Sequence, residues 1–155
     1  MARTTLICGD STKWNGHADL ILTNPYGPLP ECLVGVPAIV TNFTDRKEQV
    51  ESWVKAPLTP IGTWSSRGCT VWVANVDPVP VDTIDCIEEE YKKNHGWFPL
   101  ELPLRLLKQY GRGTVWDGFM GRGTVGRACQ ILELDFIGID IDPTCVALAR
   151  KYIAS

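Results

Sequence analysis

The sequence has few of the residues that bind metals and no segment suited to crossing a membrane. Its two histidines, His17 and His95, are far apart, and its six cysteines form no Cys-x-x-Cys pair, so we expect no metal site. No apolar run approaches the roughly 18 residues of a transmembrane helix. The beginning, MARTTLICGD, has no apolar signal stretch. These absences predict a soluble protein of the cytoplasm.

Positive charge is also scarce. The chain has 15 Lys and Arg against 18 Asp and Glu, which gives a net charge of −3. Proteins that bind nucleic acid on their own usually carry a basic excess or a basic face, so tight non-specific DNA binding is not expected. Lys13, Lys92, Lys93 and Arg112 could touch phosphates, although scattered surface cations are more often simply solvated.

What remains is an ordinary globular composition. The 155 residues are 45% hydrophobic and 21% charged, and we expect one domain over residues 1–155. Most cysteines lie in apolar runs such as TLIC and CTVWVAN, which predicts buried free thiols.

Short apolar runs alternate with amphipathic segments, which predicts an α/β fold. We expect a Rossmann-like, doubly wound, mostly parallel sheet with helices on both faces. The predicted strands are Thr4–Cys8, Asp19–Thr23, Pro37–Asn42, Cys69–Val76, Thr114–Asp117 and Phe136–Asp140. The predicted helices are Asp45–Ala56, with Thr44 or Asp45 as its cap, Val81–Asn94, Pro99–Tyr110, Val125–Glu133 and Pro143–Ala154; Leu58–Gly68, rich in Pro, Gly and Ser, is expected to be a loop.

A glycine-rich turn lies between a predicted strand and a predicted helix in VWDGFMGRGTVG. Gly121 and Gly123 would let the backbone approach a ligand at the helix N-terminus. Asp140 ends the next strand, 140 − 117 = 23 residues after Asp117, close to the spacing of a ribose-binding acid. Together these features predict a nucleoside-bearing cofactor. The alternative is a tight turn, with Asp140 and Asp142 capping the last helix.

A second motif follows the predicted strand in DLILTNPYG. Asn24, Pro25 and Tyr26 place an amide, a rigid backbone and an aromatic ring at the carboxyl end of that strand. The Asn oxygen and the proline carbonyl can accept hydrogen bonds from an exocyclic amine, and the ring can stack on the base. Alternatively, the segment is only a turn.

Five segments then resemble, in order, the exocyclic-amino DNA methyltransferases of the permuted β type: LICGDS, DLILTNPYG, HGWFPLELPLRLL, VWDGFMGRGTVGRAC and FIGIDIDPTCVALARKYI. In that family the catalytic motif precedes the glycine motif. This order accounts for the position of the glycine motif here, which follows the fifth predicted strand instead of the first. The resemblance implies S-adenosylmethionine as cofactor and a flipped DNA base as substrate.

The resemblance also implies roles for individual residues. Asn24, Pro25 and Tyr26 would form the catalytic motif. Asp10 would lie near the adenine ring of the cofactor and Asp140 would hold its ribose. The residues bordering the methionine part would be Asp117, Phe119, Gly121, Gly123 and Thr124, the last of which could equally be a helix cap. His95, Phe98 and Pro99 match a His-x-x-Phe-Pro segment that lies beside the cofactor.

The sequence departs from the family pattern at three places. TNPYG has one proline instead of two, with Tyr26 third and Gly27 in the aromatic's fourth place. Gly118 and Gly96 stand where proline is usual. We expect a minimal methyltransferase, for adenine N6 because Asn24 leads the motif; HGWFPLELP points instead to cytosine N4.

Other functions and partners stay open. The chain could be a cofactor-fold binding module or partner subunit that has lost turnover, or it could methylate RNA or a protein amide. No segment has the length of a target-recognition region, which leaves room for a specificity partner. The six tryptophans motivate the expectation of a homodimer.

Overall fold

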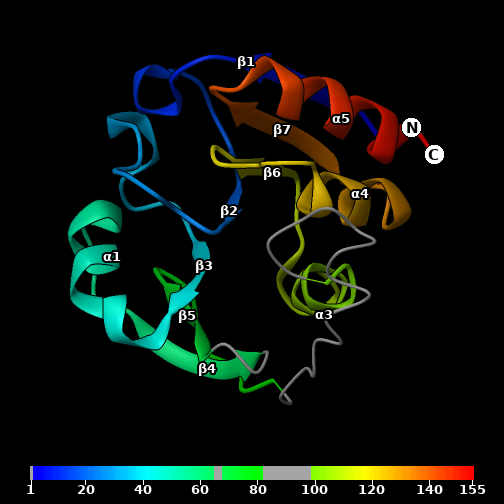
Figure 1. Ribbon diagram of the computed structural model, residues 1–155. Coiled ribbons are helices and arrows are strands. Elements are labelled where there is room, and N and C mark those ends of the chain that lie inside the picture. The colour runs from blue at the N-terminus through cyan, green and yellow to red at the C-terminus, as the bar shows by residue number, and fades with distance from the viewer. Residues whose placement is uncertain (1, 65–67, 82–98) are drawn as a thin grey trace.

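The computed structural model describes residues 2–64, 68–81 and 99–155. In this part of the chain, seven strands form one sheet in the order β1-β7-β6-β2-β3-β5-β4 (Figure 1). Their bounds are Thr4–Cys8 for β1, Leu20–Thr23 for β2, Ala38–Phe43 for β3, Thr59–Trp64 for β4, Cys69–Ala74 for β5, Thr114–Asp117 for β6 and Asp135–Asp140 for β7. The five strands β1, β7, β6, β2 and β3 pair in parallel, and the last two, β5 and β4, are antiparallel to their neighbours. The predicted mostly parallel α/β sheet is therefore confirmed.

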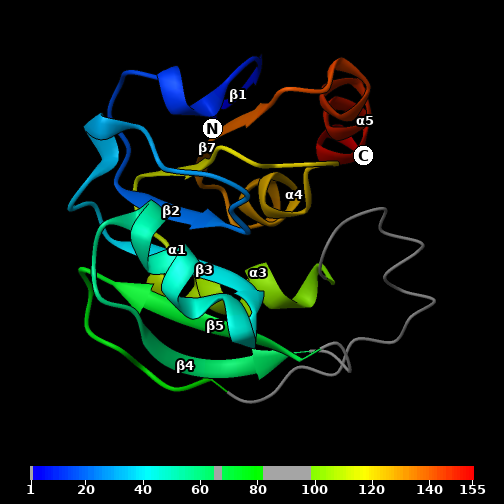
Figure 2. The ribbon, with the colours of Figure 1, turned by 60° about the vertical axis from the view of Figure 1, so that its left-hand side comes forward.

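Helices cover both faces of the sheet, as Figures 1 and 2 show from two sides. The buried strand β2 divides its side chains between them: Leu20 and Leu22 face one core, and Ile21 faces the other. The first core receives α3 (Glu101–Tyr110), α4 (Thr124–Ile131) and α5 (Pro143–Ala154). The second receives α1 (Lys47–Val54) and the turns that precede it. Both faces of the central strands are therefore apolar.

The starts of α5 and α1 differ in whether a side chain caps the first turn. In α5, Asp142 accepts a hydrogen bond from the Thr144 backbone amide at 2.9 Å, and Pro143 fits the first turn because it has no amide to satisfy. The cap predicted for α1 is wrong. Thr44 and Asp45 lie in a 3₁₀ turn over Thr44–Arg46, and the helix begins after Arg46 without a side-chain cap bond.

The loop predicted over Leu58–Gly68 is also wrong, because most of it is the edge strand β4. A proline is tolerated at an edge, where one side of the strand has no ladder, and the register with β5 shifts between Pro60 and Gly62. Ile61 and Trp64 are buried and anchor the strand on the core. The turn-rich composition concealed these two apolar anchors.

The prediction for the cysteines is only partly right. Among the described residues Cys8, Cys32, Cys129 and Cys145 are free thiols, but just Cys69 and Cys129 are buried, while Cys8 and Cys32 are exposed. Cys8 lies on β1, at the edge of the sheet, where one side of the strand has no neighbour. An apolar run on an edge strand is therefore less buried than the same run in the middle.

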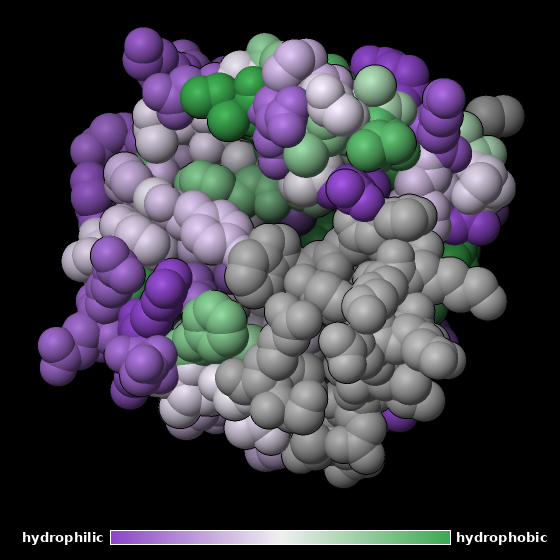
Figure 3. Space-filling view, in the orientation of Figure 1, coloured by the Kyte–Doolittle hydropathy of each residue, from purple (hydrophilic) through white to green (hydrophobic). Residues whose placement is uncertain are grey.

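Three of the five tryptophans in the described residues are buried in the interior. Trp64, Trp72 and Trp116 are among the largest fully buried side chains. Their number therefore gives no support to a dimer interface. On the face seen in Figure 3, hydrophobic residues lie in small groups among hydrophilic ones.

Several predictions lie outside the described residues: nearly all of the helix over 81–94, Cys86, and the site residues His95 and Phe98. Within the described part, no helix is both long and apolar enough to cross a membrane.

Candidate functional site

The strands that carry the two sequence motifs are neighbours in the middle of the sheet. In β2 and β6, Leu20 pairs with Val115 and Ile21 with Trp116. In the sheet, β7 lies next to β6 on one side of this pair, and β3 lies next to β2 on the other side. The chain thus leaves β6 and β2 in opposite directions. Open α/β sheets bind ligands at such a switch point, outside the carboxyl ends of the strands. The two motifs therefore follow adjacent strands in the middle of the sheet.

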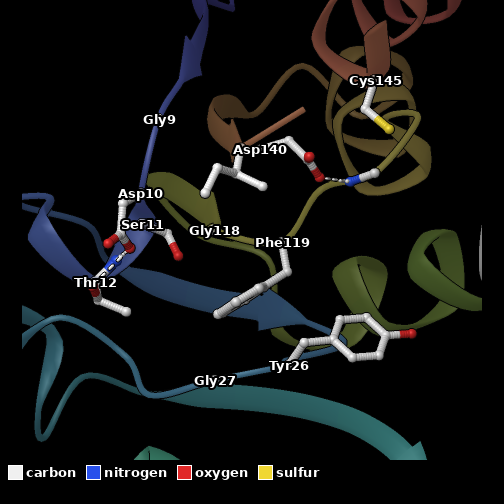
Figure 4. Close-up of a pocket in the computed structure, with 12 residues that line it drawn as sticks. Gly9, Asp10, Ser11, Thr12, Tyr26, Gly27, Gly118, Phe119, Asp140 and Cys145 are labelled. Carbon is white, nitrogen blue, oxygen red and sulfur yellow. Dashed lines mark hydrogen bonds between the residues drawn. The ribbon is translucent and has the colours of Figure 1, made fainter. Parts of the chain in front are cut away.

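A pocket of about 490 Å³ lies at this carboxyl edge (Figure 4). Its walls come from the loops after β1, β2, β6 and β7 and from the start of α5. The lining residues are Gly9, Asp10, Ser11, Thr12, Tyr26, Gly27, Gly118, Phe119, Gly121, Asp140, Ile141 and Cys145. Its size is in the range of sites for small molecules and cofactors.

Five predicted site residues line this pocket: Asp10, Tyr26, Phe119, Gly121 and Asp140. Six others that the structure describes do not: Asn24, Pro25, Pro99, Asp117, Gly123 and Thr124 are all buried behind the pocket wall or away from it.

The glycines of the β6–α4 turn have different tasks. Gly121 has φ +54° and no atom within 4 Å of where a Cβ would be, so its backbone is open toward the pocket. Gly123 has φ +93° and begins α4, while a Cβ there would come within 2.9 Å of the Ala149 Cβ on α5. One glycine therefore exposes backbone to a ligand, and the other allows two helices to approach.

Asp140, the last residue of β7, is hydrogen-bonded to the glycine turn that follows β6. One carboxylate oxygen accepts the Gly121 backbone amide at 2.9 Å (Figure 4). The other accepts the Asp142 backbone amide at 2.9 Å. Each oxygen keeps further lone pairs for hydroxyl donors. Capping of α5 falls to Asp142 alone, which leaves Asp140 turned to the pocket.

Asp10 shapes the opposite wall. Its Oδ1 accepts both the backbone amide and the hydroxyl of Thr12, at 2.9 and 2.7 Å. These two hydrogen bonds hold the pKa of the Asp10 carboxyl below its usual value. The pocket thus has a carboxylate on each side, and none of its lining residues within the described chain is Lys or Arg. This charge distribution favours a ligand that carries hydroxyl or amino donors or a positive charge.

The Asn24–Tyr26 segment connects β2 to the pocket, and Tyr26 is the first residue of the segment that lines it. Asn24 is 5% exposed, and its Oδ1 has no hydrogen-bond partner among the described residues. Pro25 is buried, and its carbonyl accepts the side-chain amide of Asn42 at 3.0 Å. Tyr26 is 45% exposed and, with Phe119, supplies an aromatic ring to one side of the pocket (Figure 4). Leaving a buried acceptor without a hydrogen bond costs about 1–3 kcal/mol of stability. A ligand that donates a hydrogen bond to this oxygen would recover that free energy.

Asp117 lies behind the pocket and is 2% exposed. Its Oδ1 accepts the Thr23 hydroxyl at 2.6 Å and the Phe119 amide at 3.1 Å. Burial raises the pKa of the Asp117 carboxyl to about 7, and the charge of Asp140 acts in the same direction, while both hydrogen bonds act against it. Asp117 therefore joins β2 to the glycine turn from within.

Thr124 is not a cap, because Gly123 occupies the N-cap position of α4. Its hydroxyl is buried without a hydrogen-bond partner among the described residues.

The glycine at position 118, where the family usually has a proline, has a physical reason. A Cβ at Gly118 would lie 2.1 Å from Trp116 Cη2 and 2.9 Å from the Ser11 Cβ, so the Trp116 ring fills the space that a proline would need.

Several residues of the site were not found from the sequence. Ile141, 76% exposed, and Cys145 line the pocket, whereas Thr23 and Asn42 support it from behind. Ile141 and Cys145 follow the predicted Asp140 closely in the sequence, so they could have been added to the predicted site on that ground. Thr23 and Asn42 act across strand pairs, which no local pattern reveals.

The pocket residues fit a nucleoside-bearing cofactor such as S-adenosylmethionine. Gly9 and Gly121 both line the pocket with no atom within 4 Å of where a Cβ would lie, so a side chain at either position would take up space there. Asp140 offers acceptors for ribose hydroxyls, and the acidic lining suits a sulfonium charge.

Comparison with known proteins adds an independent line of argument. The model of a DNA methylase family, N6_N4_Mtase, matches residues 36–151. This range includes β6, the glycine turn and Asp140, but begins after the Asn24–Tyr26 segment. No curated protein matches the sequence.

Solved structures share the fold. The M1.HpyAVI–SAM complex aligns with a TM-score of 0.71 at 16% identity, over 98% of this chain and 100% of that one. TTHA0409 from Thermus thermophilus, complexed with S-adenosyl-L-methionine, gives 0.65 at 16% identity over 99% and 95%. The cytosine-N4-specific PvuII DNA methyltransferase gives 0.64 at 12% identity over 96% and 86%.

Proposed function

Because the chain belongs to the N6_N4_Mtase family of DNA methylases, we propose that it transfers a methyl group from S-adenosylmethionine to the exocyclic amine of a flipped DNA base. The observation that carries this proposal is the buried Asn24 Oδ1, which has no hydrogen-bond partner among the described residues, two positions before Tyr26 in a pocket lined by an open glycine turn and the Asp140 carboxylate. Two of the structures with this fold were solved with the same cofactor.

The cofactor would be held by residues of all four pocket loops. Asp140 would accept hydrogen bonds from the ribose hydroxyls, and Asp10 would lie at the adenine end. Phe119 and the Gly121 backbone would border the methionine part, with Asp117, Gly123 and Thr124 supporting the turn from behind. When bound, S-adenosylmethionine supplies a methyl group activated by a sulfonium.

Asn24 would orient the target amine. Its Oδ1 can accept one N–H of the amine, which directs the nitrogen lone pair away from the ring plane and toward the pocket. Tyr26, at the pocket's edge, would stack on the flipped base. Positioning of this kind accounts for large rate effects without a covalent enzyme intermediate.

We propose adenine N6 as the target, since Asn24 leads the motif. Cytosine N4 is the alternative, and it is the specificity named for PvuII methyltransferase. The modified nucleoside decides between them. Unmethylated genomic DNA is incubated with the protein and cofactor, digested, and its nucleosides are identified by mass spectrometry. N6-methyl-2′-deoxyadenosine supports the proposal, whereas N4-methyl-2′-deoxycytidine moves the target to cytosine.

Two variants connect activity to the site. Asn24→Ala should reduce methyl transfer by about 100-fold or more while cofactor binding, measured by calorimetry, is retained. Asp140→Asn should weaken cofactor binding. Its matched control is Asp135→Asn, at the other end of β7, where the carboxylate accepts only the Arg3 amide at 2.8 Å and is exposed. Binding lost equally in both β7 variants would contradict the role of Asp140.

The same measurements separate the other classes of function. Cofactor binding with no transfer to DNA, unchanged by Asn24→Ala, would identify a binding module or partner subunit. Transfer to RNA or a protein amide in place of DNA would identify a different substrate. DNA is the proposed partner, and a homodimer would appear as a doubled mass in light scattering with or without DNA.

A further inference from the structure

The backbone ladder of β2 stops just before the motif. In the parallel pair with β3 the last partners are Thr23 and Val40. If this register continued, Pro25 would lie opposite Asn42, but the ladder ends at Thr23 and, among the described strands, no ladder bond holds the Pro25 carbonyl. The side chain of Asn42 takes that place, donating from Nδ2 to the Pro25 oxygen at 3.0 Å.

The Asn42 amide is held in one orientation. Its Oδ1 accepts the Phe43 backbone amide at 2.8 Å, so Nδ2 is the atom that faces Pro25. A rotated amide would place oxygen against the Pro25 carbonyl and NH₂ against an N–H donor, and would lose both hydrogen bonds. Asn42 is 3% exposed, which excludes water as a ready substitute.

The neighbourhood of Asn42 is a rigid polar layer between β3 and β5. Asn42 pairs with Thr70 in the antiparallel ladder. The Thr41 hydroxyl donates to the Thr70 carbonyl at 2.9 Å, and the Thr44 and Thr70 hydroxyls are 2.6 Å apart. The Asn42 side chain therefore projects from a fixed support.

We propose that Asn42 is a positioning residue that fixes the Pro25 carbonyl as the second acceptor for the target amine. This inference rests on the proposed function and deepens it. An exocyclic amine has two N–H bonds, and both must be held for its lone pair to point in one direction. The Asn24 Oδ1, which has no partner among the residues that the structure describes, takes one.

The Pro25 carbonyl takes the other. A carbonyl oxygen has two lone pairs, and Asn42 occupies one of them, which leaves the second for the substrate. Because a hydrogen bond received on one lone pair fixes the direction of the other, Asn42 would act on the amine through the Pro25 carbonyl without touching the base. Its removal should affect the rate more than the binding of either substrate.

The test compares three variants at one position. Asn42→Ala removes the donor, Asn42→Asp places a carboxylate oxygen toward the carbonyl, and Asn42→Ser restores a hydroxyl donor on a shorter side chain. We expect kcat to fall about 10- to 100-fold in Asn42→Ala and further in Asn42→Asp, with Asn42→Ser intermediate. The KM for DNA and the Kd for S-adenosylmethionine should stay within about threefold of the native values.

Thr41→Val is the matched control. Thr41 is equally buried on the same strand, but its hydroxyl donates to the Thr70 carbonyl and accepts from the Trp64 side chain, instead of bonding the Pro25 carbonyl. This variant should lose stability without a selective loss of kcat. Each protein is assayed well below its own Tm, so that differences in the folded fraction do not enter.

A second measurement does not depend on activity. The side-chain NH₂ signals of Asn42 in the NMR spectrum, assigned by their loss in Asn42→Ser, should be protected from exchange with solvent. Exchange as fast as that of exposed amides would overturn the inference. So would an active native protein whose kcat is unchanged in Asn42→Ala, or one in which Thr41→Val and Asn42→Ala lose kcat equally. A native protein that protects this amide yet methylates no nucleic acid contradicts the proposed function and, with it, the role of Asn42 in the reaction.

Discussion

The buried carboxyl of Asp117 should make the protein less stable as the pH rises, and Asp117→Asn should remove this effect. In the folded protein the pKa of Asp117 is raised to about 7, from 3.8 in the unfolded chain. The folded state therefore holds a proton that the unfolded state has lost. The stabilisation is present in full below about pH 4, decreases as the pH rises toward 7, and is absent above it.

The magnitude follows from the two pKa values. A difference of about three pH units, at roughly 1.4 kcal/mol per unit, gives about 4 kcal/mol for the cost of ionising the buried group. In Asp117→Asn the amide oxygen can still accept from Thr23 and Phe119. Its NH₂ group is a new buried donor, at a cost of about 1–3 kcal/mol.

The variant should thus be less stable than the native protein near pH 4.5 and more stable, by about 1–3 kcal/mol, near pH 8.5. Urea unfolding at a series of pH values measures the difference in unfolding free energy. The control is Asp135→Asn, an exposed acid for which the difference should stay flat within about 0.5 kcal/mol. An equally flat difference for Asp117→Asn would refute a protonated, buried Asp117.

Two further changes test the surroundings of this residue. Thr23→Val removes a donor that lowers the Asp117 pKa, so a carboxyl titration by NMR should show that pKa rising further; an unchanged value would mean that the 2.6 Å bond does not form in solution. Gly118→Ala should destabilise the fold by about 1–3 kcal/mol, because the added methyl group meets the Trp116 ring. The cost should shrink in a Trp116→Phe background, which lacks the ring atoms in contact, and equal costs in both backgrounds would disprove this cause.

Local patterns in the sequence predicted most of the fold, for identifiable reasons. β1, β6 and α5 begin and end where apolar runs, turn residues and the Asp142 cap predict. β4 was missed because edge strands tolerate Pro and Gly, so its composition is that of a loop. The cap of α1 was missed because a 3₁₀ turn precedes the helix and changes where it starts.

The same distinction applies to the site. Tyr26, Gly121 and Asp140 were predicted because each belongs to a motif at the end of a strand, and such ends meet at one edge of the sheet; Asp10 and Phe119 were predicted from the family resemblance. The bond between Thr23 and Asp117 joins residues 94 positions apart, and it exists because β2 lies beside β6. The order of strands in a sheet is a tertiary property, so supports of this kind are not visible in local patterns.

These supports explain how a short loop can hold an unsatisfied group. The ladder from β2 to β6 ends at Ile21 and Trp116, and the ladder to β3 ends at Thr23 and Val40. Beyond those points, side chains continue the cross-strand bonding on both sides, through Thr23 to Asp117 and through Asn42 to Pro25. Asn24 lies between the two supports with its Oδ1 unpartnered in the described structure. A loop free to relax would turn that oxygen to water, so fixing both flanks keeps the acceptor buried and ready for a substrate donor.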